Sequence, residues 1–258
     1  MRIYMISLKR DAARREAMQK RFPKYYSQFH IIDAVDAKDA SNAELIAKYD
    51  KPCPSDKRKP LTQGEKCCAI SHVLALENFL QSGDEHCIII EDDLIGEDAD
   101  FDDAIALLSA NKLNGLTVLG GQEGLKNTKH LIGVQVSGTL WKVSKIARRF
   151  LLRTCCYSLD TGTAKLIVSC QLSCLTRADS WSKILPSRVD FFYSENFTHP
   201  IDLNKSNLEA ERKVDGLFER AYRDGLIRII SNNSIKIATR FIVFLKIRKK
   251  LTWGVAKK

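Results

Sequence analysis

The stretch His86-Cys87-Ile88-Ile89-Ile90-Glu91-Asp92-Asp93 decides how the rest of this sequence is interpreted. Its first part is a continuous run of mostly β-branched residues, which is typical of a central strand buried on both faces of a sheet. Such a strand would deliver three adjacent carboxylates to its C-terminal end. Because ligands of open α/β sheets bind at strand C-termini, we expect these carboxylates to mark a functional site.

Strands and helices alternate around this stretch. Thr62 and Glu65 form a capping box, which predicts a helix start after Thr62. The pattern predicts an α/β body with a mostly parallel sheet. The expected strands are 2–7, 29–35, 86–90, 116–119, 134–143, 154–158 and 189–193, and the expected helices are 11–22, 62–81, 102–108 and 161–175.

The acidic triplet itself indicates a metal site. Three adjacent carboxylates repel one another, and this repulsion raises their pKa values unless a cation is close. Mg²⁺ and Mn²⁺ take carboxylate oxygens and usually bridge one or two of them to a substrate diphosphate. The alternative is a solvated acidic loop, because five further Asp or Glu residues follow between positions 97 and 103.

The positive charge of the chain is concentrated at its end. The formal net charge is +10, yet residues 225–258 hold nine of the 41 Lys and Arg and no Asp or Glu, which leaves +1 for residues 1–224. A nucleic-acid binder would spread basic residues over its folded domain, so we expect no nucleic-acid partner. Apolar residues interleave with these cations, which predicts a helical segment that docks on an anionic membrane surface. The alternative is that residues 235–251 pack on the body as a terminal helix.

Targeting features favour a cytoplasmic protein. Residues 1–10 are too short an apolar run for a signal peptide, and eight Cys without an export signal indicate a reducing compartment. The apolar run Phe241 to Leu245, which no other run exceeds, is far shorter than the roughly 20 residues that span a bilayer. We therefore expect a location in the cytoplasm, peripheral to the inner face of the cytoplasmic membrane.

Several motifs in a fixed order resemble glycosyltransferase family 25. They are Leu8-Lys9-Arg10 with Arg14, then Gly64-Glu65-Lys66-Cys67-Cys68-Ala69-Ile70-Ser71-His72, then Ile88-Ile89-Ile90-Glu91-Asp92-Asp93. Similarity continues through Leu119-Gly120-Gly121, Thr154-Cys155-Cys156-Tyr157, Ala178-Asp179-Ser180-Trp181 and His199-Pro200. The resemblance covers most of residues 1–212, which we expect to be a catalytic domain, and leaves 213–258 as a basic amphipathic C-terminal segment.

What the resemblance implies is a GT-A type nucleotide-sugar-binding fold and a Mn²⁺- or Mg²⁺-dependent enzyme. It would transfer a sugar, often galactose, from a UDP-sugar to a lipid-linked lipooligosaccharide or lipopolysaccharide acceptor, with inversion at the anomeric carbon. Asp93 would bind the metal, and Asp92 or Glu91 would contact the ribose or the metal shell. His199 is a further candidate metal ligand, as a histidine is in several GT-A enzymes, although a His before Pro is also a common turn residue.

The end of the first strand offers a place for the diphosphate. Leu8 belongs to the family motif there, and Arg10 and Arg14 could meet phosphate oxygens in charge-assisted contacts. The competing interpretation is a solvated basic helix face, because other Lys and Arg residues lie nearby.

The helix that follows Thr62 carries Glu65, Ser71 and His72 in the family register. Glu65 and His72 project toward the same side, so we expect a polar pair near one end of the pocket. Alternatively, His72 packs against the neighbouring strand as an ordinary helix-face histidine. Gly120 and Gly121 could let the backbone approach the donor sugar, but two glycines make a turn equally well.

An inverting displacement needs a carboxylate that takes the proton of the acceptor hydroxyl. Among Asp179, Asp190 and Asp202 we choose Asp179, because Trp181 beside it offers an apolar platform for a sugar ring. The alternative is that Asp179 is only a helix N-cap. Two other functions remain open: an anionic-surface or nucleic-acid-binding protein, and a relative that has lost catalysis. Metal-dependent binding of a UDP-sugar would exclude the binding protein, and the intact Glu91-Asp92-Asp93 speaks against a relative that has lost catalysis.

Overall fold

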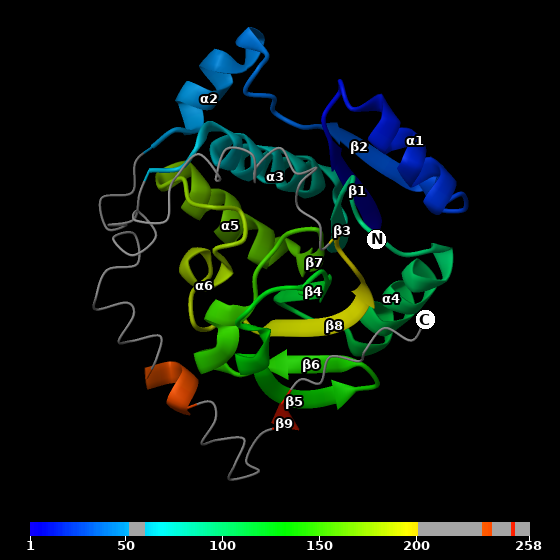
Figure 1. Ribbon diagram of the computed structural model, residues 1–258, viewed down its shortest axis with the longest axis vertical. Helices are drawn as coiled ribbons and strands as arrows, with labels where there is room; N and C mark the ends of the chain where they lie inside the picture. The colour runs from blue at the N-terminus through cyan, green and yellow to red at the C-terminus, as the bar shows by residue number, and fades with distance from the viewer. Residues whose placement is uncertain (52–59, 201–233, 239–248, 251–258) are drawn as a thin grey trace.

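The computed structural model describes residues 1–51, 60–200, 234–238 and 249–250 (Figure 1). Within them one sheet has the strand order β2-β1-β3-β7-β4-β8-β6-β5-β9. The strands are β1 (Arg2–Ser7), β2 (Phe29–Asp33), β3 (His86–Glu91), β4 (Leu116–Gly120), β5 (Ile132–Ser137), β6 (Leu140–Val143), β7 (Cys156–Asp160), β8 (Phe191–Phe197) and β9 (Lys249–Lys250). The α-helices are α1 (Ala12–Arg21), α2 (Ala43–Tyr49), α3 (Gln63–Ser82), α4 (Asp98–Asn111), α5 (Thr161–Ser173) and α6 (Trp181–Ile184). The 3₁₀ helices are η1 (Tyr26–Gln28), η2 (Ala40–Asn42), η3 (Thr128–His130) and η4 (Lys145–Phe150).

Helices cover both faces of the sheet. Successive side chains of a strand point to opposite faces, so each central strand contributes to two cores. In β1, Tyr4 and Ile6 enter the larger core, which contains residues of α3 and α5, whereas Ile3 and Met5 enter the smaller core with residues of α1 and α4. Figure 1 shows these two helix pairs on either side of the strands. The predicted α/β class is confirmed.

The strand directions divide the sheet. β1 pairs in parallel with β2 and β3, and β4 pairs in parallel with β8. β7 is antiparallel to both β3 and β4, and the ladders around β6 and β5 are antiparallel as well. The sheet is therefore mixed, and the parallel arrangement expected from the sequence is found in β2-β1-β3. Because those three strands point the same way, their C-terminal ends meet at one edge, with Ile6 beside Glu91 and Ser7 beside Asp33.

Helix α3 forms as its sequence predicts. The Thr62 hydroxyl accepts a hydrogen bond from the Glu65 N–H at 3.2 Å, and the Glu65 carboxylate accepts one from the Thr62 N–H at 3.2 Å. These two contacts are the predicted capping box, and they satisfy backbone donors that have no partner within the helix. The helix ends at Ser82, and Gly83 after it has a φ of 79°, a left-handed conformation that glycine adopts without strain.

The segment 134–143, expected as one strand, is a hairpin of β5 and β6. Gly138 has a φ of 46°, and its carbonyl accepts a hydrogen bond from the Gln135 side chain at 2.6 Å. A glycine in the left-handed region reverses the chain, so the apolar run continues in an antiparallel partner strand. The apolar residues of 134–143 predicted one continuous strand, whereas Ser137-Gly138-Thr139 within it forms a turn.

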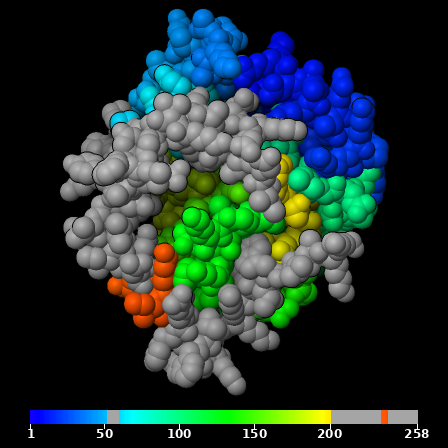
Figure 2. Space-filling view, viewed as in Figure 1, coloured from blue at the N-terminus to red at the C-terminus, as the bar shows by residue number. Residues whose placement is uncertain are grey.

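The C-terminal part of the chain contacts the body where it is described. Residues 234–238 are helical, and Ile235 packs against the larger core while Ile237 is exposed. Figure 2 shows this segment in orange beside the green residues of the body. Lys249 and Lys250 pair with Gly133 and Ile132 at the edge of β5. The expected boundary at 212/213 and the remaining residues of the amphipathic segment lie outside the described residues.

Two further features bear on the expected location. No helix in the described part of the chain is long and apolar enough to cross a membrane. Cys174, which follows α5, is disulfide-bonded, a bond that the sequence analysis did not predict. The other described cysteines are not disulfide-bonded, and the eighth, Cys53, lies outside the described residues.

Candidate active site

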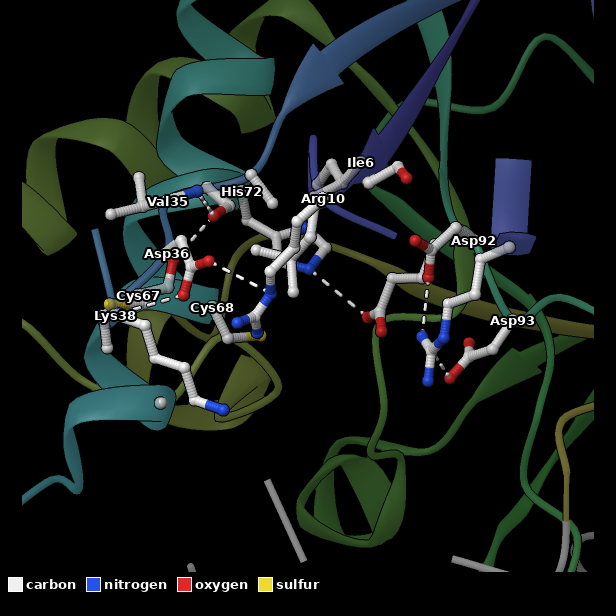
Figure 3. A pocket seen from close by; sticks show the side chains of 18 residues that line it. Ile6, Arg10, Val35, Asp36, Lys38, Cys67, Cys68, His72, Asp92 and Asp93 are labelled. Carbon is white, nitrogen blue, oxygen red and sulfur yellow. Dashed lines mark hydrogen bonds and ion pairs between the residues drawn. The ribbon is translucent and has the colours of Figure 1, made fainter. Parts of the chain in front are cut away.

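A cavity of about 330 Å³ opens where the C-terminal ends of β1, β2 and β3 meet the N-terminal half of α3. This is the size of a small-molecule binding pocket. Asp92 and Asp93 lie on one side of it, and His72, Arg10 and Lys38 come from the other side (Figure 3). All three members of the acidic triplet line the cavity.

Glu91 is held as an ionised carboxylate. His72 Nε2 lies 3.3 Å from Glu91 Oε1, and the Thr154 hydroxyl donates a hydrogen bond to the same oxygen. Burial by itself would raise the pKa of Glu91, but the hydrogen bonds and charge of His72 together with Thr154 lower this pKa to about 2. His72 in turn hydrogen-bonds Tyr157 through Nδ1 at 3.0 Å. His72 therefore faces the cavity as part of a buried polar chain.

Asp92 and Asp93 have unequal partners. The Arg14 guanidinium donates to Asp92 Oδ1 at 2.7 Å, and the Ser7 side chain also hydrogen-bonds this carboxylate. Asp93 Oδ2 lies 3.8 Å from Arg14, and Asp93 Oδ1 is buried without a hydrogen-bond partner among the described residues. Burial and the charge of Glu91 raise the pKa of Asp93 to about 6, against the opposing effect of His199 and Arg14. Asp93 is the member of the triplet whose ionised form most needs a further cation.

His199 reaches this carboxylate from the far half of the sheet. Its Nε2 lies 3.6 Å from Asp93 Oδ2, although the two residues are far apart in sequence. Gly120 and Gly121 make the approach possible, because a Cβ on Gly120 would lie 1.8 Å from the Phe197 carbonyl oxygen and one on Gly121 would lie 2.0 Å from Cys155 Sγ. Neither glycine lines the cavity. Their lack of side chains leaves room for the end of β8 to pack against the end of β4.

The donor atoms of Asp93 and His199 suit a divalent cation. His199 Nδ1 lies 2.9 Å from the Pro200 carbonyl oxygen, which can only accept, so Nδ1 carries the proton. In the neutral ring the lone pair of Nε2 is then left facing the Asp93 carboxylate, an arrangement that a shared cation relieves. No group of three or more His, Cys, Asp and Glu in the described ranges is placed to hold a metal by itself. A metal with two protein ligands fits a site completed by substrate phosphates.

Three other predicted residues line the cavity. Leu8 does so from the end of β1, and Arg10 beside it pairs with Asp36 at 3.1 Å. The Ser71 hydroxyl accepts a hydrogen bond from the Val35 N–H at 2.9 Å, which fixes the loop after β2 against α3. Ser71 thus shapes the cavity wall.

The expected pairing of Glu65 with His72 is wrong. Glu65 does not line the cavity. Besides its capping contact it accepts two hydrogen bonds from Arg177, at 2.7 and 3.2 Å. Glu65 and His72 lie seven residues apart on α3, but Arg177 of the loop after α5 binds Glu65, so only His72 reaches the cavity. Glu65 joins α3 to that loop.

Asp179 lies outside the cavity lining, and its Oδ2 accepts a hydrogen bond from the Arg153 N–H at 3.3 Å. The N-cap of α6 is Ser180. The sugar platform expected from Trp181 is wrong, because this side chain is only 2% exposed, packs on Tyr157 and donates from Nε1 to the Arg153 carbonyl. An aromatic residue in a polar motif suggested a surface role, whereas the loop buries it. The role of Asp179 as general base stays a prediction.

Sequence reasoning missed Asp36 and Lys38, and it assigned no role to Thr154, although Thr154 stands in one of the motifs of the resemblance. Asp36 and Lys38 line the cavity from the loop after β2, and Thr154 binds Glu91 from the residues before β7. A usable signal existed for the first two, because polar residues directly after a parallel strand lie at the ligand-binding edge. The motif gave no role for Thr154, since its contact with Glu91 depends on the pairing of β7 with β3.

The fold and the cavity together define an α/β protein with a small-molecule site at the carboxyl ends of its parallel strands. A family model, glycosyltransferase family 25 (LPS biosynthesis protein), matches residues 1–168, and the chain belongs to this family.

Curated relatives match a shorter part of the chain than the family model does. The chain is 35% identical over 98 residues to the lipooligosaccharide biosynthesis protein lic2B of Haemophilus influenzae, covering 38% of this chain and 35% of that protein. It is 33% identical over 99 residues to procollagen galactosyltransferase 2 of Homo sapiens, covering 36% of this chain and 15% of that protein. The matches therefore span little more than a third of these relatives at most.

Among solved structures, the mannose-1-phosphate geranyltransferase of Thermus thermophilus aligns with a TM-score of 0.40 at 14% identity, covering 75% of this chain and 73% of that one. This similarity is too weak to carry an argument.

Proposed function

We propose that this protein is a glycosyltransferase that transfers a sugar from a UDP-sugar, with galactose the expected sugar, in the presence of Mn²⁺ or Mg²⁺. The observation that carries the proposal is the buried Asp93 carboxylate in the lining of the cavity, with one oxygen that has no hydrogen-bond partner among the described residues and the His199 imidazole 3.6 Å from the other. The GT-A type of the fold belongs to the same proposal. Family membership supports it, because relatives in the family are named as galactosyltransferases.

Asp93 and His199 would hold the cation, with Asp92 close by in the same turn. A bound divalent cation would neutralise charge that builds on the leaving diphosphate. Arg14 holds Asp92 in place, so Asp92 is oriented for the metal shell or a ribose hydroxyl. Glu91, whose pKa is about 2, is a poor proton acceptor near neutral pH. Its fixed carboxylate is suited to accept a hydroxyl hydrogen bond from the donor.

The cations on the opposite wall would face the diphosphate. Arg10 and Lys38 lie there, and Arg10 is oriented by Asp36. Charge-assisted contacts of this kind favour a substrate that carries negative charge. In the proposed inverting reaction, Asp179 remains the candidate base. It would have to reach the acceptor hydroxyl from the edge of the cavity, because it is not part of the lining.

For the acceptor we propose a lipid-linked lipooligosaccharide or lipopolysaccharide saccharide at the inner face of the cytoplasmic membrane. The similarity to lic2B and the basic residues of 225–258 support this proposal. Sedimentation with phosphatidylglycerol vesicles would test the membrane part, comparing the full chain with a chain truncated after Asp224. Equal binding of the two at low salt would mean that the tail does not dock on the membrane.

The decisive experiment is a screen of UDP-galactose, UDP-glucose and their N-acetylated relatives for hydrolysis by the purified protein with and without Mn²⁺. We expect Mn²⁺-dependent release of UDP from one donor and loss of this release in Asp93→Asn. Asp103→Asn is the matched control, because Asp103 is an exposed carboxylate of α4 away from the cavity. If no donor binds, or if Asp93→Asn turns over like the control, the proposed function is wrong.

A further inference from the structure

Arg153, which lies between η4 and β7, has an unusual backbone conformation. Its φ is 64°, and the only other non-glycine residue with a positive φ in the described ranges is Lys112, at 43°. Lys112 is the C-cap of α4, where a left-handed residue commonly ends a helix. Arg153 has no such role, because η4 ends at Phe150. A left-handed backbone is unfavourable for a residue with a Cβ, and strained residues of this kind gather at functional sites.

The backbone of Arg153 joins two segments of the site. Its N–H donates to the Asp179 carboxylate at 3.3 Å, and its carbonyl accepts from Trp181 Nε1 at 3.1 Å. The next residue, Thr154, donates from its hydroxyl to Glu91. The loop that carries Asp179 is thus held beside the strand end that carries Glu91. A glycine would adopt this backbone without strain, so these contacts do not explain why an arginine side chain is present here.

The side chain of Arg153 is anchored but makes little use of its charge. Its Nη1 donates to the Gly121 carbonyl at 2.7 Å. Within the described residues this is the one hydrogen bond of the side chain, and no carboxylate there forms an ion pair with the guanidinium. A guanidinium has five N–H groups, so four remain for water or for a ligand. The residue is half-buried, so its positive charge is held in place and remains accessible.

This charge lies close to the proposed metal ligands. Gly121 is the link, because a Cβ on it would lie 3.7 Å from the His199 Cβ. Since the Arg153 Nη1 lies 2.7 Å from the carbonyl oxygen of the same glycine, it is at most about 10 Å from the His199 Cβ. The thiol of Cys155 lies within range of both signs of charge: burial raises its pKa, two carboxylates of the triplet raise it as well, and Arg153 lowers it.

Arg153 approaches the acidic triplet from the side opposite to the other cations. Arg10 and Lys38 follow β1 and β2, whereas Arg153 precedes β7, which lies on the other side of β3 in the sheet. The cavity is formed on the side of β1 and β2, and Arg153 is not part of its lining. If the nucleoside of a UDP-sugar occupies this cavity, the sugar and the phosphate attached to it extend past the triplet toward Arg153.

We propose that Arg153 binds the β-phosphate of the UDP-sugar and stabilises the negative charge that develops on it as the sugar leaves. The inference rests on the proposed glycosyltransferase function and adds a residue that acts on the leaving group. The planar guanidinium matches phosphate oxygens in geometry and in charge. The strained backbone then has a function, because it holds this side chain against Gly121 while the next residue binds Glu91.

The bond changes show where this positive charge is needed. A hydroxyl oxygen of the acceptor, or of water in hydrolysis, forms the new bond to the anomeric carbon, and the hydroxyl proton passes to a base. The bond from the anomeric carbon to the β-phosphate oxygen breaks, and its electron pair stays on UDP. Negative charge therefore grows on the β-phosphate in the transition state, and a fixed cation beside it lowers the barrier.

Calorimetry on the full chain with Mn²⁺ compares the binding of UDP with the binding of UMP, which lacks the β-phosphate. The variant is Arg153→Asn, because asparagine is neutral and tolerates the left-handed conformation better than most residues with a Cβ. The matched control is Lys112→Asn, which also removes one positive charge from a left-handed position but lies outside the cavity lining. We expect Arg153→Asn to lose about tenfold or more in UDP affinity and little in UMP affinity, while the control keeps both.

Hydrolysis of the UDP-sugar selected by the donor screen gives a second measurement. We expect kcat to fall about 10²-fold in Arg153→Asn and less in Arg153→Lys, which keeps the charge but loses the planar fork. Intact UMP binding shows that the variant is folded with its nucleotide pocket in place. An Arg153→Asn protein with wild-type UDP affinity and turnover overturns the proposal, and so does an equal loss for UMP or in the control. A wild type that binds no UDP would contradict the proposed function itself, on which the inference rests.

Discussion

The two halves of the sheet contribute to the site in different ways. The parallel half, β2-β1-β3, supplies the cavity walls through residues that directly follow its strands, such as Arg10, Asp36 and the acidic triplet. The half beyond β7 supplies His199, which arrives only because β8 packs on β4 beside Gly120. A site can thus combine a locally encoded part with a part that depends on the whole fold.

The largest effect is expected when both proposed metal donors are removed, one from each half of the sheet. We expect Asp93→Ala to reduce turnover of the UDP-sugar by about 10²–10³-fold, the range seen when one electrostatic contact to the transition state is removed. His199→Ala should reduce turnover by about 10-fold or more. If the two residues hold one cation, the double variant should resemble Asp93→Ala.

Steady-state turnover at saturating Mn²⁺ provides the measurement, with Asp103→Asn as the control. Asp93→Ala should unfold at no lower a urea concentration than the wild type, because burial and the charge of Glu91 already make the ionised Asp93 carboxylate unfavourable. Effects that simply multiply in the double variant would show that Asp93 and His199 act on different steps.

The difference between the halves also explains what the sequence could predict. The capping box at Thr62 and the apolar run before Glu91 are local signals, and both led to correct elements. The cavity residues at the ends of β1 and β3 and on α3 were predicted from the motifs of the resemblance, each of which is a short stretch of sequence. Three residues could not be placed from the sequence, because each is fixed by a partner from a distant segment. The pairs are Glu65 with Arg177, Trp181 with Arg153, and Thr154 with Glu91. Long-range packing decided these three cases.

The next prediction concerns the contact that brings β8 to the site. Gly120 has a φ of 132°, and a Cβ there would lie 1.8 Å from the Phe197 carbonyl oxygen. We expect Gly120→Ala to lower the free energy of unfolding by about 2 kcal/mol or more, because backbone strain and a clash with backbone combine.

Gly83→Ala is the matched control for that change. Gly83 also has a positive φ, of 79°, but no atom lies within 4 Å of its added Cβ. Its substitution should therefore show the strain alone, about 1 kcal/mol. Equal losses for the two variants in urea denaturation would mean that the contact between β4 and β8 is not tight.

The smallest effect is expected for a substitution at the junction of the two halves of the sheet, where β7 lies between β3 and β4. Asp160 ends β7, caps α5 by accepting from the Thr163 N–H at 2.9 Å, and accepts from the Gly115 N–H at 2.6 Å. Burial opposes ionisation, but these hydrogen bonds outweigh it and lower the pKa of Asp160. A depressed pKa in the folded state means that the stabilisation is fully present above the unfolded pKa of about 3.9 and is lost as the pH falls through the folded pKa.

Asp160→Asn should therefore reduce the free energy of unfolding at pH 7 by about 1 kcal/mol and flatten its dependence on pH below about 4. Urea denaturation between pH 3 and 7 measures this, with Asp103→Asn as the exposed control. An unchanged pH profile in Asp160→Asn would show that the junction does not depend on the charge of this carboxylate.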